Sequence, residues 1–81
     1  MLTMDKSRTL FYENELKSNI LRLTKGTISQ HEASALAQQA IDVLDWSNSA
    51  LQHKGFGWIA GKLLEKIGYS FNYTTKAYEL N

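Results

Sequence analysis

The chain has 81 residues, with 9 Lys and Arg against 8 Asp and Glu, and it contains neither Cys nor Pro. This length provides for one domain, and the lack of Cys excludes a disulfide-stapled scaffold and Cys-ligated zinc. A net charge of +1 is not the footprint of a basic nucleic-acid-binding domain. The sequence shows neither the apolar core of a signal peptide nor a run near the roughly 18 apolar residues that span a membrane. We therefore expect one cytoplasmic domain over residues 1–81 that does not associate with membranes.

The first predicted helix runs from about Ser7 to Lys25. Its apolar residues recur at the spacing that places them on one face of a helix. Lys25 in the last turn would complement the helix dipole, and Gly26 would close the helix in a left-handed conformation. The apolar positions are Phe11, Tyr12, Leu16, Ile20, Leu21 and Leu23.

The second predicted helix has the clearest start in the chain, a capping box over Ser29-Gln30-His31-Glu32. In this motif the Ser29 hydroxyl accepts from the Glu32 amide, while the Glu32 carboxylate reaches back to the Ser29 amide. We expect the helix to extend to about Trp46. Because alanines leave little side-chain bulk, another helix is expected to approach closely. The apolar positions are Ala33, Leu36, Ala37, Ala40, Ile41, Val43 and Leu44.

The third predicted helix spans about Phe56 to Ile67, after a break in the chain that ends at Gly55. Before Gly55 the pattern leaves two alternatives open: a short helical turn, or a continuation of the second helix. Gly57 and Gly61 lie one turn apart, and small residues there favour close approach of a neighbouring helix over a phosphate-binding loop. The apolar positions are Phe56, Ile59, Ala60, Leu63, Leu64 and Ile67.

Residues 69–81 form a C-terminal extension in which Tyr69, Phe71 and Tyr73 alternate with polar residues, a pattern typical of a strand. A lone strand needs a partner from a hairpin, from the N-terminal residues or from another chain. A short helix from Thr75 is the alternative. If the extension packs on its own helices it is a lid, and if it pairs with a second copy it forms a homodimer. The predicted fold is all-α: a small three- or four-helix bundle with a short aromatic C-terminal extension.

No catalytic, cofactor or metal site is expected. The pair His31-Glu32 lacks the second histidine of a zinc-protease motif, since Ala35 occupies that position. Asp42 and Asp45 share a helical face but have no third carboxylate close by in the predicted helix, so they indicate a solvated surface rather than a Mg²⁺ site.

The charge distribution and the two tryptophans give the candidate binding residues. Residues 27–53 carry three carboxylates and neither Lys nor Arg, whereas each flank has a net charge of +2. This asymmetry has two interpretations, complementarity between packed helices or an acidic face for a partner. Tryptophan is usually buried, but an exposed one would be a binding hot spot. The candidate partner-binding residues are Glu32, Asp42, Asp45, Trp46 and Trp58.

The function that the sequence favours is a small non-catalytic protein-binding module, of the inhibitor or immunity type, that acts through an acidic helical face. The alternative is a small nucleic-acid-associated regulator that uses basic residues of the first and third helices. Nucleic acid is the less favoured partner, and no cofactor is expected.

Overall fold

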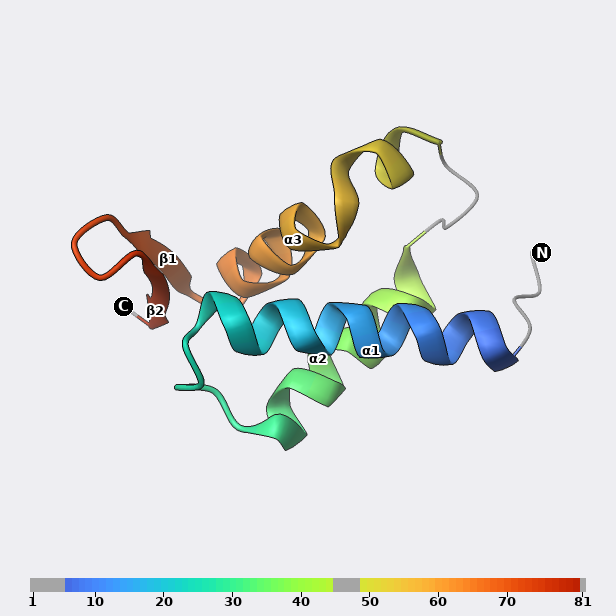
Figure 1. Ribbon diagram of the computed structural model, residues 1–81, viewed down its shortest axis with the longest axis horizontal. Coiled ribbons are helices and arrows are strands. Elements are labelled where there is room, and N and C mark those ends of the chain that lie inside the picture. Colours follow the sequence, from blue (N-terminus) through green and yellow to red (C-terminus); the bar gives the residue numbers. More distant parts are fainter. Residues whose placement is uncertain (1–5, 45–48, 81) are drawn as a thin grey trace.

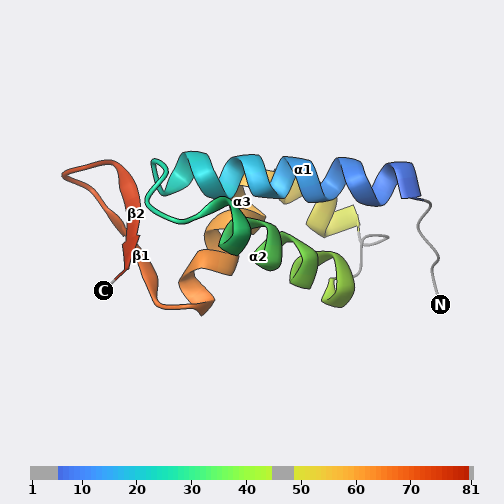
Figure 2. The ribbon, with the colours of Figure 1, turned by 90° about the horizontal axis from the view of Figure 1, so that it is seen from below.

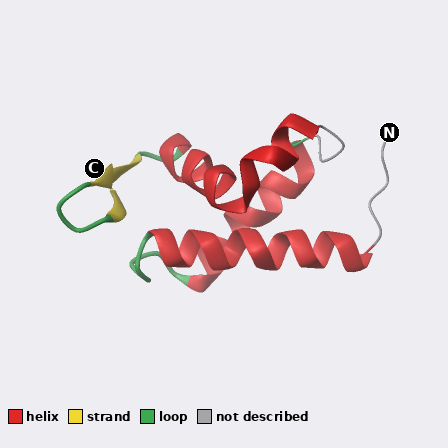
Figure 3. Cartoon of the chain, turned by 45° about the horizontal axis from the view of Figure 1, so that its top comes forward, coloured by secondary structure: helices red, strands yellow, loops and turns green. Residues whose placement is uncertain are grey.

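A computed structural model of the chain describes residues 6–44 and 49–80. Three helices are followed by a two-stranded antiparallel hairpin, so the fold is all-α with a short C-terminal strand extension, as predicted. The elements are α1 (Lys6–Leu23), α2 (Gln30–Val43), α3 (Ser49–Lys66), β1 (Tyr69–Asn72) and β2 (Ala77–Leu80). Helix α1 lies along the longest dimension of the molecule, and the hairpin extends beyond one end of the helices (Figures 1 and 3). In the described part of the chain, no helix is both long and apolar enough to cross a membrane.

Helix α1 ends two residues earlier than predicted. The amide of Lys25 donates to the Arg22 carbonyl and the amide of Gly26 donates to the Leu21 carbonyl, which is the hydrogen-bond pattern of a Schellman cap. Both Lys25 and Gly26 have a positive φ, so the left-handed turn begins one residue before the expected glycine. Lys25 therefore lies outside the helix, and its ammonium group donates to the Thr75 carbonyl in the hairpin turn at 2.5 Å.

Helix α2 begins as predicted. The Ser29 hydroxyl accepts from the Glu32 amide at 3.1 Å, as the capping box predicts. The Glu32 carboxylate does not contact the Ser29 amide as predicted; it accepts from the Ser29 hydroxyl at 3.5 Å instead. The helix stops at Val43 because Leu44, the C-cap, is extended, so the expected continuation to Trp46 is wrong. Ala33, Leu36, Ala37 and Ala40 of the predicted apolar face are buried.

Helix α3 consists of two helical pieces that meet at Gly55, where φ is 82° and ψ is 166°. That conformation is strained for residues with a side chain and explains why glycine stands there. The first piece is the short helical turn that was one of the two alternatives. The second piece ends at Lys66, and Ile67, which was expected in the apolar stripe, is 43% exposed.

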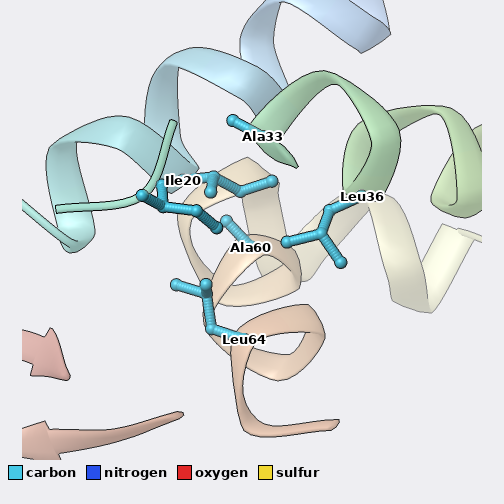
Figure 4. Close-up of a cluster of buried hydrophobic side chains, with 6 residues drawn as sticks. Ile20, Ala33, Leu36, Ala60 and Leu64 are labelled. Carbon is cyan, nitrogen blue, oxygen red and sulfur yellow. The ribbon is translucent and has the colours of Figure 1, made fainter. Parts of the chain in front are cut away.

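The core lies where α2 and α3 both pack against the same side of α1, which contacts each of them far more extensively than they contact each other (Figure 2). Figure 4 shows Ile20, Ala33, Leu36, Ala60 and Leu64 converging from the three helices. A second cluster continues the core along α1 and consists of Leu16, Ala37, Ala40 and Ile59.

The hairpin supplies its own strand partner, so the alternative of a helix from Thr75 is wrong. Tyr69 pairs with Leu80 and Asn72 with Ala77. The turn is held by the Asn72 side-chain oxygen, which accepts from the amides of Thr74 and Thr75.

Of the three alternating aromatic residues of the extension, two lie in β1 and the third lies in the turn. Tyr69 packs against the core cluster, and Phe71 lies opposite Tyr78 with ring centroids 5.4 Å apart. Tyr73 falls in the turn beyond β1 and is 77% exposed.

Candidate functional site

A groove of about 530 Å³ lies between the C-terminal end of α2 and the second piece of α3. Both helices pack on α1 but contact each other at few positions. Their side chains therefore leave open space between the two helices on the side away from α1. We call it the α2–α3 groove. It is lined by Val43, Leu44, Trp58, Ile59, Lys62, Leu63, Glu65 and Lys66.

Val43 is the most exposed apolar side chain of the groove. It occupies the last turn of α2, and 74% of its surface is accessible. The sequence placed Val43 beside the buried stripe, and that expectation is wrong, since Val43 lies on the outer side of the last turn of α2, where the other described elements leave it exposed. Its side chain adds apolar surface to the rim of the groove.

Trp58 forms the opposite rim of the α2–α3 groove. The sequence left open whether Trp58 is buried or exposed, and in the structure 45% of its surface is exposed. The ammonium groups of Lys54 and Lys62 lie 5.4 and 5.6 Å from its ring centroid, within the range of cation–π attraction. These lysines hold positive charge beside an indole that remains accessible.

The charged residues of the groove are predominantly basic. Lys62 and Lys66 line the groove and are exposed, and Lys54 is exposed beside Trp58. Among the described lining residues Glu65 is the single carboxylate, and it pairs with Lys62 at 3.3 Å. Because both members of this pair are about half exposed, it contributes little to stability. The groove thus combines an apolar floor with a basic rim.

The predicted acidic residues do not join this surface. Glu32 lies in the first turn of α2 and takes part in its cap, whereas Asp42 is exposed in the last turn. Ten residues of helix separate them by about 15 Å along the axis. Asp45 and Trp46 lie outside the described residues. Of the three predicted partner-binding residues that the structure describes, Trp58 is the one that lines the α2–α3 groove.

The basic rim was visible in the sequence but was not recognised. Trp58, Lys62 and Lys66 follow one another at steps of four residues, which places them along one side of the second piece of α3, and Lys54 lies four residues before Trp58, on the other side of the kink at Gly55. The candidate residues chosen from the sequence included Trp58 but none of these lysines.

The described residues contain no cluster of three or more His, Asp or Glu with the proximity that a metal ion requires. His31 is exposed in the first turn of α2. No family model, curated protein or solved structure matches the chain.

Proposed function

We propose that this chain is a small non-catalytic protein-binding domain, and that the α2–α3 groove receives an apolar segment of a partner protein. The observation that carries the proposal is the exposed indole of Trp58 at the rim of an apolar groove. Tryptophan is strongly enriched among the residues that dominate binding energy, particularly where a pocket surrounds it. A cytoplasmic location belongs to the same proposal and is supported by the Cys-free sequence.

The groove replaces the acidic face as the proposed recognition surface. An inhibitor-like mode through α2 would need several carboxylates close together, and Glu32 and Asp42 lie near opposite ends of the helix. An apolar groove between two helices is instead a common site for a third helix or an extended segment.

The alternative, a nucleic-acid-associated regulator, draws support from Lys54 and Lys62 beside Trp58, since single-stranded nucleic acids bind to aromatic rings flanked by cations. The first helix adds little to that surface. Arg22 donates to the Asn19 side chain, and Lys25 donates to the hairpin turn. An apolar floor also has no role in contacting phosphates, so protein binding is the better-supported proposal.

A peptide-display selection tests the proposed function. Peptides enriched on the wild-type protein are measured against Trp58→Ala and against Leu10→Ala, which truncates an apolar residue on α1 that is more exposed than Trp58. We expect Trp58→Ala to weaken binding at least about tenfold and Leu10→Ala to leave it unchanged. Enriched peptides that bind all three proteins equally would contradict the proposal. Tight binding of oligothymidylate that weakens steeply with salt, and is lost in Trp58→Ala, would favour the nucleic-acid alternative.

A further inference from the structure

We infer that the occupant of the α2–α3 groove is an acidic amphipathic helix, whose apolar side chains fill the groove and whose carboxylates meet Lys54, Lys62 and Lys66. This inference rests on the proposed function, and it specifies the chemistry and secondary structure of the partner.

The shape of the groove favours a helix. Its two walls are the end of α2 and the second piece of α3, and each wall contributes apolar side chains: Val43 and Leu44 from one, Trp58 and Leu63 from the other. A helix laid between two others buries residues at positions i, i+3, i+4 and i+7 against both walls. A partner helix in this position would pack beside α2 and α3 as a fourth helix.

The charges of the rim favour carboxylates. Lys62 and Lys66 are one helical turn apart, about 6 Å along the axis of α3. Acidic residues spaced i, i+4 on a helix running beside α3 have the same repeat, so each carboxylate can face one ammonium group. Glu65 opposes a partner carboxylate and pairs with Lys62. Lys62 and Lys66 against Glu65 give the described lining residues a net charge of +1, and Lys54 beside Trp58 adds a second positive charge.

A second copy of the chain is a poorer occupant. Its acidic helix is α2, and the exposed carboxylates Glu32 and Asp42 are ten residues apart, which does not match the one-turn spacing of Lys62 and Lys66. The apolar face of α2 that would have to enter the groove is also already buried in the core, at Ala33, Ala37 and Ala40.

Two peptide probes of about four helical turns test this inference. Both carry Leu at i, i+3, i+4 and i+7, but one has Glu and the other Lys at the flanking positions. Binding is measured by isothermal titration with the wild-type protein at low and moderate salt. The double variant Lys62→Gln, Lys66→Gln removes two positive charges from the rim. Its control, Gln30→Glu with Gln38→Glu, gives the same net charge on exposed positions of α2 away from the groove.

We expect the Glu peptide to bind at least about tenfold more tightly than the Lys peptide, with a difference that shrinks as salt screens the charges. The lysine variant should lose that preference, and the control should keep it. If both peptides bind equally and Trp58→Ala weakens both, the acidic character is overturned and the proposed function stands. If neither peptide binds and the display selection yields no groove-dependent binder, both are overturned. Light scattering that shows the protein alone to be a dimer, dissociated by Trp58→Ala, would assign the groove to a second copy and overturn the inference.

Discussion

The Tyr78 ring of β2 closes over Gly61 of α3, so that a Cβ atom on Gly61 would lie 2.8 Å from the Tyr78 hydroxyl oxygen and 3.3 Å from its Cζ. Gly61 is buried inside a helix, a position where glycine costs about 1 kcal/mol relative to alanine. The sequence assigned both glycines of this helix to contact with a neighbouring helix. Gly57 does face α1, at Asn19 and Arg22, whereas Gly61 admits the hairpin instead.

Gly61→Ala should lower the free energy of unfolding by about 1–3 kcal/mol, because the added methyl displaces Tyr78 from its place on the helix. Gly57→Ala is the matched control: its nearest atoms are at 3.6 Å, an ordinary contact, so stability should stay equal or rise by up to about 1 kcal/mol. Urea denaturation measures both variants. Adding Tyr78→Phe to Gly61→Ala removes the closest atom and should restore part of the loss. Equal stability of the two alanine variants would show that the hairpin does not rest on Gly61.

Leu64 is the core residue whose truncation should destabilise the protein most clearly. This side chain is fully buried between the helices, and Leu64→Ala should cost about 2–5 kcal/mol. Leu44 and Leu63, which the sequence placed in the core stripes, are only partly buried at the groove and should cost less when truncated. Val43→Ala is the control and should change stability by no more than about 0.5 kcal/mol, because Val43 is 74% exposed. Circular dichroism during thermal unfolding gives the order of stability of these variants. A Leu64→Ala protein as stable as Val43→Ala would contradict the burial of Leu64 between the helices.

The hairpin holds the carboxylate of Glu79 in a set of hydrogen bonds. Hydrogen bonds from Asn72 and Thr75, together with the charge of Lys25, hold the pKa of Glu79 below its usual value of 4.5. A lowered pKa means that the ionised form stabilises the folded state above pH 4.5, and that this contribution is lost as the pH falls through the folded-state pKa. Glu79→Gln should therefore reduce stability at pH 7 by more than it does at pH 3. Urea midpoints at the two pH values test this, with Glu65→Gln as the control for loss of an exposed carboxylate. A difference in urea midpoint between the wild type and Glu79→Gln that is the same at both pH values would contradict the hydrogen bonding of the Glu79 carboxylate.

The C-terminal extension offered two predictions, a lid on its own helices or a homodimer seam. Tyr69 and Tyr78 pack against the core cluster and Ala77 is buried, which supports the lid. Deletion of residues 69–81 should then lower the melting temperature while light scattering gives a monomer before and after. A full-length dimer that becomes monomeric on deletion would support the homodimer instead.

Local signals in the sequence predicted much of the fold. The start of α2 follows from Ser29 and Glu32, whose hydrogen bond needs only four consecutive residues. The kink at Gly55 was likewise marked by its glycine. The exposure of Val43 and Trp58 was not predictable, because it depends on how far α2 and α3 diverge across α1 and not on any pattern within either helix. The hairpin was one of the three partners that the sequence left open for the predicted strand, and the structure shows it. The bounds of its second strand, residues 77–80, were not predictable because these residues acquire strand character through pairing with β1.

If a partner segment occupies the α2–α3 groove, the residues that line the groove should change their surroundings on binding. Chemical-shift changes of the ¹⁵N-labelled protein during titration with the Glu peptide show this residue by residue. The indole N–H of Trp58, assigned from the spectrum of Trp58→Phe, reports on the rim, and the amides of Val43, Leu44 and Leu63 report on the walls. We expect the largest shifts at these four residues and little change at the hairpin turn around Tyr73. Shifts concentrated on the hairpin or around Leu10, with the groove resonances unmoved, would contradict it.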